Sequence, residues 1–402
     1  MNLQNKTVIL GISGSIAAYK MADVASALAK MHCDVHTIMT KNATEIVAPL
    51  TFSTLTSHKC VTDTFDKTVD YNVAHVALAK KADVLLVAPA TANIIAKLAI
   101  GLADDMLTTT ALACTCPKII APAMNTAMFE NPVVQRNIAA LKADGWTVIE
   151  PAAGILACKD VGQGKLADVS LIMEYVLRVI AYPKDLTGRH ILITAGPTCE
   201  AIDPVRFITN HSSGRMGYAL ARVAMQRGAD VTLVSGPTVL EPIPFITTIP
   251  IRSAQDMYDA VMDQAPSQDI IIKAAAVADY TPAVYADEKI KKDAGRDDST
   301  LFLCRTKDIL ETLGRTKAPH QFICGFSMET QNLIENSRKK LHKKHVDMIV
   351  ANSLRDAGAG FQGDTNIVTV ITPDQAESLP LLPKEEVANR ILDQIMTEME
   401  RR

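Results

Sequence analysis

Short apolar runs alternate with segments of helical periodicity along the whole chain. The first forty residues read as a strand, a glycine-rich turn, a helix and a second strand over 34–39. Within the helix, Met21, Val24, Ala25 and Leu28 recur at the spacing of a single helix face. This order predicts a βαβ unit at the start of the chain.

The same layout begins again in mid-chain. A strand over 190–194 leads into a loop that ends at Ser212-Ser213-Gly214, and a helix up to Gly228 and a strand over 230–234 follow. A second complete opening unit predicts a second nucleotide-type domain.

The joint between the two units lies where turn-forming residues interrupt a helical pattern, at Pro183, Asp185 and Gly188. We therefore expect one domain over residues 1–182 and another over residues 189–402. The length of 402 residues agrees with this division, because domains usually hold about 100–200 residues.

Further apolar strands in both halves run into polar residues. In the first half, strands over 83–87 and 118–121 precede Asn93 and Asn125. In the second half the corresponding strands are 269–273, 321–325, 347–350 and 366–371, and polar clusters at Asp279, Ser327 and Asn352 follow the first three. Open α/β sheets bind ligands at the carboxyl ends of their strands. The pattern predicts an α/β protein with two doubly wound, Rossmann-like domains, each with a site at one sheet edge.

Composition narrows the function classes. Lys and Arg number 41 against 44 Asp and Glu, a net charge of -3, so the chain has no electrostatic footprint for nucleic acid. The apolar runs have strand length, far below the ~20 residues of a membrane span. The polar start, which leads straight into a strand, predicts a cytoplasmic protein.

The eight cysteines include no C-x-x-C pair, so they indicate neither a disulfide framework nor a zinc site. Cys158 differs from the others because it lies in the glycine-rich stretch 154–164, which we interpret as a mobile loop or flap. The neighbouring Lys159 favours thiolate, as expected of a thiol that exchanges protons.

Two candidate sites in the first half allow more than one interpretation. The segment Gly11-Ile12-Ser13-Gly14-Ser15 is either a phosphate site at a helix N-terminus or a plain tight turn, and it is not a G-x-G-x-x-G fingerprint. His75, at the start of a helix, is either a cap or surface residue or, if it faces the asparagine-lined edge, a proton acceptor.

Lysine clusters at 287–292 and 340–344 are either solvated faces or groups that reach a polyphosphate. Neither a Walker-type G-x-x-x-x-G-K-[ST] segment nor a G-x-S-x-G elbow occurs in the chain. The clusters therefore suit nucleoside triphosphate chemistry without a P-loop.

With these residues in view, the chain resembles the bacterial bifunctional coenzyme A biosynthesis family, in which phosphopantothenoylcysteine decarboxylase is fused to phosphopantothenate-cysteine ligase. In the first half the resemblance lies in residues 11–17, His75, 88–93, 101–105, 122–128 and 157–158. In the second half it lies in 203–206, 210–214, 274–279, 289–292, 325–326 and 340–344. Lys159, Thr306-Lys307 and Ser327-Met328 depart from the usual family pattern.

For the first half the resemblance implies an FMN-dependent decarboxylase. The flavin oxidises the substrate thiol to a thioaldehyde, and carbon dioxide then leaves. His75 would be the base, Asn125 would hold the substrate carboxylate and Cys158 would protonate the enethiol. The FMN-binding residues implied are Gly11, Ser13, Gly14, Ser15, Thr40, Pro89, Ala90, Thr91, Asn93 and Thr108.

For the second half the resemblance implies a CTP-dependent ligase. Phosphopantothenate would be activated as an acyl-cytidylate, and the cysteine amine would then displace CMP, with Mg²⁺ on the phosphates. Lys289 would stabilise the transition state and Asn210 would hold the acyl-cytidylate. The CTP and substrate residues implied are Arg206, Ser212, Gly214, Ala274, Ala275, Ala276, Asp279, Lys289, Lys307, Asp308, Ile309, Leu310, Phe326, Lys340 and Lys344.

Two other functions compete with this interpretation. Fused NAD(P)-dependent oxidoreductase domains are disfavoured because both opening loops lack G-x-G-x-x-G. A flavin-binding regulatory subunit is disfavoured because His75, Asn125 and Cys158 occur together. The resemblance further implies a homo-oligomer, a dodecamer of trimeric decarboxylase and dimeric ligase units, whose partners are small molecules.

Overall fold

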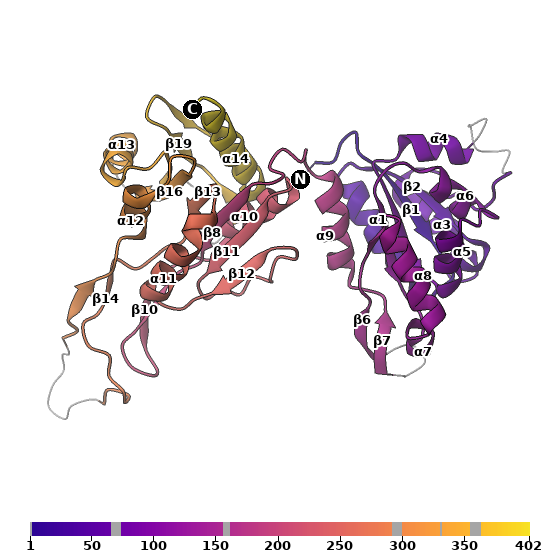
Figure 1. Ribbon diagram of the computed structural model, residues 1–402, viewed down its shortest axis with the longest axis horizontal. Helices are drawn as coiled ribbons and strands as arrows, with labels where there is room; N and C mark the ends of the chain where they lie inside the picture. The colour runs from indigo at the N-terminus through magenta and orange to yellow at the C-terminus, as the bar shows by residue number, and fades with distance from the viewer. Residues whose placement is uncertain (1, 66–73, 156–160, 292–299, 330–331, 354–362) are drawn as a thin grey trace. The chain divides into compact units, whose positions relative to one another are not determined.

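The computed structural model describes residues 2–65, 74–155, 161–291, 300–329, 332–353 and 363–402. The chain divides into two compact units, Met1–Pro183 and Lys184–Arg402. Each unit has its own sheet, with helices packed against it (Figure 1). The predicted α/β class with two doubly wound domains is confirmed.

The sheet of the first unit consists of five parallel strands in the order β2-β1-β3-β4-β5. The strands are β1 (Thr7–Ile12), β2 (Asp34–Met39), β3 (Val84–Ala90), β4 (Lys118–Pro122) and β5 (Thr147–Val148). From the central pair β1 and β3, the chain adds β2 on one side and β4 and β5 on the other. The connections that follow β1 and β3 therefore lie on opposite faces of the sheet. A crevice at this switch point is where such sheets bind ligands.

Successive side chains of each strand point to opposite faces of the sheet, so they contribute to two separate hydrophobic cores. Val8, Leu10 and Ile12 of β1 pack on one side with α1 (Met21–Lys30), α3 (Pro49–Thr56) and α9 (Val169–Ile180). Ile9 points to the other side, which α4 (Ala74–Lys81), α5 (Ala92–Ile100), α6 (Met106–Ala113) and α8 (Pro132–Ala143) cover. The predicted apolar face of α1 is buried, as expected. Shorter elements are η1 (Ile16–Lys20), α2 (Lys41–Thr44), α7 (Thr126–Phe129), β6 (Ala152–Ile155) and β7 (Val161–Lys165).

The sheet of the second unit has eight strands in the order β12-β11-β8-β13-β16-β17-β19-β20. They are β8 (His190–Ala195), β11 (Asp230–Ser235), β12 (Thr247–Pro250), β13 (Ile270–Lys273), β16 (Phe322–Glu329), β17 (Met348–Ser353), β19 (Thr369–Ile371) and β20 (Ala376–Ser378). The first six pair in parallel, whereas β19 pairs antiparallel with both β17 and β20. The parallel part has the dinucleotide-fold order, whose switch point lies between β8 and β13.

Two kinds of strand prediction in this unit need correction. β16 continues to Glu329 and β17 continues to Ser353, so Ser327 and Asn352 lie within strands rather than in polar clusters after residues 325 and 350. The predicted strand over 366–371 is divided between β18 (Thr365–Asn366), which pairs with β21 (Leu382–Pro383), and β19. Both errors arise because pairing with a neighbour, which the local pattern does not contain, sets where a strand ends.

Helices cover both faces of this second sheet (Figure 1). α11 (Ala254–Gln264), α12 (Ile309–Thr316) and α13 (Leu333–Lys344) pack on one face, and α10 (Arg215–Gln226) and α14 (Lys384–Glu400) pair on the other. Additional elements are η2 (Ala265–Ser267) and the strand pairs β9 (Cys199–Ala201) with β10 (Phe207–Thr209) and β14 (Tyr280–Pro282) with β15 (Leu303–Arg305). No helix in the described ranges is long and apolar enough to cross a membrane.

Arg227, directly after α10, connects three parts of the second unit. Its side chain is 4% exposed and lies 2.5 Å from Asp185 and 2.6 Å from Asp393. The guanidinium also donates to the side-chain oxygen of Asn389 at 3.1 Å. This network fixes the start of the unit and α14 to the end of α10.

Candidate functional sites

Three strands of the first sheet are followed by a hydroxyl residue that caps the next helix. Ser15 caps η1, Thr40 caps α2 and Thr91 caps α5, each accepting a backbone amide at 3.3–3.4 Å. These caps follow β1, β2 and β3, so the three helix starts lie at the same sheet edge. Helix N-termini attract anions, and this edge therefore fits the phosphate of a bound nucleotide or flavin.

Ser13 joins the two loops that border the switch point. Its buried hydroxyl donates to the carbonyl of Pro89 at 2.7 Å and accepts the amide of Thr91 at 3.0 Å. A Cβ added at Gly11 would lie 2.4 Å from Leu107, and one at Gly14 would lie 2.5 Å from the Cβ atom of Asn42. The packing around Asn42 requires glycine at position 14, whereas at position 11 the atom in contact is a terminal methyl group of Leu107, and Ser13 links the two loops by hydrogen bonds.

A largely apolar cavity of about 400 Å³ opens beside this crevice. Ser15 and Asn125 contribute polar groups to it, and its other lining residues are Ile16, Ala17, Tyr19, Lys20, Ala123, Met124, Ile155, Gly164, Lys165 and Leu166. Asn125 caps α7, where its side-chain oxygen accepts the amide of Ala127 at 2.9 Å. An apolar cavity with few polar groups suits a flat ring system and a small polar substrate.

The predicted loop over 154–164 contains, in its described parts, the paired strands β6 and β7. This hairpin packs on the segment before Asn125, because the amide of Met124 donates to the carbonyl of Gly164 at 2.9 Å. Gly164 has φ +127°, and a Cβ there would lie 2.4 Å from the Met124 carbonyl oxygen. Only glycine permits this contact. Cys158 lies outside the described residues.

The remaining predicted residues of the first half are dispersed. His75 is half-buried in α4 and is not among the residues lining the Asn125 cavity. Pro89 and Ala90 lie within β3, whereas Asn93 is exposed in the first turn of α5. Thr108 is buried, and its hydroxyl donates to Asp105 at 2.9 Å in a capping box. Within the described residues of one chain, Ser15 and Asn125 line the same cavity, and His75 does not line it.

Two adjoining cavities, of about 420 and 510 Å³, lie at the carboxyl edge of the second sheet. The first gathers the predicted residues Asn210, Ser212, Gly214, Ala274, Ala275 and Ala276. The second gathers Lys307, Asp308, Ile309, Leu310 and Lys344. Asp279, Phe326 and Lys340, also predicted, line both. These predicted residues therefore line neighbouring cavities, and their roles remain predictions.

The loops around the first of these cavities are fixed by hydrogen bonds to one another. The amide of Ala275 donates to the hydroxyl of Thr194 at 3.1 Å, and the amide of Ala276 donates to the carbonyl of Gly196 at 3.0 Å. Asn210 donates to the carbonyl of Ala276 at 2.9 Å. The two sides of the switch point are therefore pre-organised around Asn210.

Lysines give this region its charge. Lys344 lies 2.6 Å from Asp308 and 2.5 Å from Glu311, and these bonds raise the pKa of Lys344 although burial opposes them. Asp308 also caps α12 by accepting the amide of Glu311 at 2.9 Å. Lys340 donates to the hydroxyl of Ser327 at 3.4 Å. Lys344 is thus already paired, while Lys340 has a neutral partner and lines both cavities.

Sequence reasoning missed Lys273, which lines both cavities. Burial, helped by the nearby charge of Lys340, lowers its pKa from 10.5 to about 8. The signal was available, because Lys273 ends the predicted strand over 269–273 and strand ends form the binding edge of such sheets.

Arg206 and Lys289 lie outside the lining of both cavities. Arg206 pairs with Asp203 at 2.5 Å and donates to the carbonyl of Ile290 at 3.0 Å. The guanidinium keeps the pKa of Asp203 well below its usual range. Lys289, next to Ile290, is exposed. Arg206 therefore fixes the position of the segment that carries Lys289.

Comparison with known proteins identifies both units. The Flavoprotein family matches residues 1–181, and the DFP family, described as the DNA/pantothenate metabolism flavoprotein C-terminal domain, matches residues 186–399. The coenzyme A biosynthesis bifunctional protein CoaBC of Bacillus subtilis (strain 168) is 48% identical over 397 residues, which are 98% of this chain and 97% of that protein. The CoaBC of Vibrio vulnificus (strain YJ016) is 44% identical over 99% of both chains.

A crystal structure of the C-terminal domain of a CoaBC protein is also similar. It shares 47% sequence identity, covers 54% of this chain and 98% of its own, and has a TM-score of 0.46. The two competing interpretations, NAD(P)-dependent oxidoreductase domains and a regulatory subunit, receive no support from these matches. The predicted resemblance is confirmed, and the chain belongs to the family of bifunctional coenzyme A biosynthesis proteins, with an N-terminal flavoprotein domain and a C-terminal DFP domain.

Proposed function

We propose that this chain joins cysteine to 4'-phosphopantothenate at the expense of CTP and then decarboxylates the product to 4'-phosphopantetheine with FMN. Membership of the family makes the chain both a ligase and a decarboxylase. The observation that carries the proposal is that each sheet has a site at its switch point and that the two sites differ in chemistry. One is an apolar cavity with Asn125, and the other is a lysine-lined pair of cavities with Asn210.

In the ligase step, the carboxylate of phosphopantothenate attacks the α-phosphate of CTP and pyrophosphate leaves. Lys273 and Lys340, which line both cavities, are placed to neutralise the charge of the phosphates. Asp279 lines both as well and is the carboxylate that would hold Mg²⁺ beside them. Asn210 would orient the acyl-cytidylate for attack by the cysteine amine, and Lys289 would stabilise the first transition state.

In the decarboxylase step, the helix starts at Ser15, Thr40 and Thr91 would hold the flavin phosphate. The bound flavin supplies the oxidation of the substrate thiol that makes the adjacent carboxylate a good leaving group. Asn125 would orient that carboxylate, and His75 would accept the thiol proton. Cys158 would return a proton, and the hairpin that flanks its segment packs directly beside Asn125.

The decarboxylase site is completed by a second copy of the chain in this proposal. Within the described part of one chain, His75 is not among the residues that line the cavity of Asn125. Large apolar side chains are exposed near the site, with Ile16 at 62% and Tyr19 at 58%. Burying such residues stabilises an interface between copies. A trimeric decarboxylase unit and a paired ligase unit together give the expected dodecamer.

One incubation tests the proposed pathway. The protein receives phosphopantothenate, cysteine and CTP, and CMP and 4'-phosphopantetheine are followed by mass. His75→Asn should abolish carbon dioxide release from phosphopantothenoylcysteine supplied directly and leave CTP-dependent ligation intact, whereas Lys289→Gln should slow pyrophosphate release and leave the flavin content unchanged. Equal loss of both activities in His75→Asn would contradict two independent sites.

A further inference from the structure

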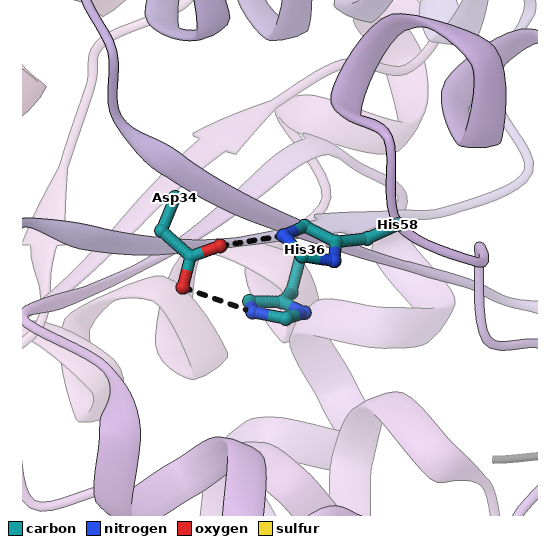
Figure 2. Close-up of side chains that lie close together, drawn as sticks. All are labelled: Asp34, His36 and His58. Atoms are coloured by element: carbon teal, nitrogen blue, oxygen red, sulfur yellow. Dashed lines mark hydrogen bonds and ion pairs between the residues drawn. The ribbon is translucent and has the colours of Figure 1, made fainter. Parts of the chain in front are cut away.

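Two histidines and an aspartate meet on the edge strand of the first sheet (Figure 2), and none of the three lines the Asn125 cavity. Asp34 and His36 are alternate residues of β2 and therefore lie on the same face of the strand, and His58 follows α3. One carboxylate oxygen of Asp34 lies 2.6 Å from Nε2 of His58, and the other lies 3.3 Å from Nε2 of His36. The potential ligand atoms of all three residues lie within 4.8 Å of one another.

A cation of the chain itself already lies in this cluster. The ammonium of Lys81, at the end of α4, is 2.6 Å from Asp34 and 3.3 Å from Nε2 of His36. The Lys81 side chain is 45% exposed, whereas that of His36 is 9% exposed. The carboxylate and the imidazole thus form a position that accepts a positive charge, and its present occupant can move into solvent.

We propose that Asp34, His36 and His58 form a binding site for a divalent transition-metal ion, with Zn²⁺ the best match, and that Lys81 fills the cation position when no metal is bound. Two imidazoles and one carboxylate are a zinc-type donor set that leaves a fourth position for water. Magnesium and calcium, by contrast, take oxygen ligands, so they do not match a site with two imidazoles.

Binding requires small, local rearrangements. The imidazole rings of His36 and His58 are stacked at 4.2 Å with an angle of 19° between their planes, and both Nε2 atoms face the carboxylate (Figure 2). A metal must lie close to the plane of each ring that binds it, so His58, whose side chain is 40% exposed, has to turn. Nε2 of His58 must also give up the proton that it donates to Asp34, either to water or to its own Nδ1.

The two cysteines nearest to these ligands in the sequence, Cys33 and Cys60, do not belong to the group of ligand atoms within 4.8 Å of one another. Cys33 is buried, and its thiol donates to the carbonyl of Lys6 at 3.1 Å. Cys60 is 3% exposed. The site therefore consists of nitrogen and oxygen donors, and a bound Co²⁺ should lack the charge-transfer absorption of a cobalt–thiolate bond.

The test uses the full-length flavin-loaded protein after removal of metals with a chelator. Zn²⁺ binding is measured by equilibrium dialysis with elemental analysis, and Co²⁺ binding by its visible bands at longer wavelength than the flavin absorption. We expect the wild type to bind one equivalent of metal ion per chain, and we expect His36→Asn and His58→Asn to lose this binding. His32→Asn is the matched control, because His32 is exposed and has φ +61°, a conformation that asparagine accepts.

Lys81→Met distinguishes a metal site from a hydrogen-bonded cluster that is complete without metal. It keeps all three ligands and removes the competing ammonium, so Zn²⁺ should bind about twofold to fivefold more tightly, the range of a half-exposed ion pair. Unchanged or weaker binding in this variant would overturn the proposal. The proposal also fails if the wild type binds no saturable equivalent, or if His36→Asn binds Zn²⁺ as the wild type does while its flavin content shows that it is folded.

Discussion

Replacing Ser13 by alanine tests whether the switch point of the first sheet retains the flavin because it is rigid. The Ser13 hydroxyl donates to the carbonyl of Pro89 and accepts the amide of Thr91, so it joins the loops after β1 and β3. We expect Ser13→Ala to loosen this crevice and to lower the affinity for flavin, with no effect on the ligase domain.

The size of the expected loss in flavin affinity follows from the hydrogen bonds that remain in Ser13→Ala. The backbone amide of Ser13 also donates to the Pro89 carbonyl, at 3.3 Å, so this carbonyl keeps a partner. The Thr91 amide loses the hydroxyl, and an unsatisfied backbone group of this kind costs about 1–2 kcal/mol. If the whole cost falls on the flavin-binding conformation, the affinity decreases about fivefold to thirtyfold.

The assay is the ratio of flavin to protein absorbance after extended dialysis, together with the unfolding temperature. Ser53→Ala is the matched control, because the Ser53 hydroxyl likewise donates to a proline carbonyl, that of Pro49 at 3.1 Å, and accepts an amide, that of Cys60 at 2.9 Å. Ser53→Ala should lower the unfolding temperature by a similar amount and retain the flavin. Wild-type flavin retention in Ser13→Ala, or equal loss in both variants, would refute the reasoning.

Three further variants test other parts of the molecule. Gly164→Ala places a Cβ against the Met124 carbonyl at positive φ, so it should displace the hairpin and slow carbon dioxide release at least tenfold without affecting ligation, as followed by product mass. Arg227→Ala should lower the stability of the C-terminal domain by about 2 kcal/mol in thermal unfolding, whereas the exposed Arg390→Ala should change it by less than about 0.5 kcal/mol. The pKa of Lys273 falls from 10.5 to about 8 in the fold, so between these pH values the unfolded chain binds the extra proton and stability rises with pH. Lys273→Met should abolish that rise in a pH series of unfolding, stabilise the unliganded domain at pH 7 and slow ligation.

The strands and the binding edges could be predicted from the sequence because they depend on local patterns. Buried parallel strands are continuous apolar runs, and Asn125 lies just beyond such a run, whereas Asn210 follows the short antiparallel strand β10. Lys340 and Lys344 were recognisable as a cluster, and both line the second cavity. What a local pattern cannot show is which charges are already paired. Lys344 is bonded to Asp308 and Glu311, and only the packing of α12 against α13 reveals this.

The features that escaped sequence reasoning depend on contacts between distant segments. The glycines of the stretch 154–164 suggested a loop, yet its described parts form a hairpin because Gly164 can approach the Met124 backbone. His36 and His58 gave no signal, since 22 residues separate them and only the return of the chain after α3 brings them to the carboxylate of Asp34. The specific role of Lys289 in stabilising the transition state came from the resemblance, and it remains a prediction.

The two sheets have their cavities at the same kind of edge, and the residues at the strand ends give these cavities different chemistry. Both sheets diverge around a central pair of strands, β1 and β3 in one and β8 and β13 in the other, and each has its cavities at the carboxyl edge near that pair. In the first, small and apolar side chains with hydroxyl caps leave a site suited to a ring and a single phosphate. In the second, β13 ends in Lys273 and α13 contributes Lys340, so the same kind of edge carries cations suited to a polyphosphate. Exchanging the strand-end chemistry, rather than the order of strands, is therefore the change that would convert one kind of site into the other.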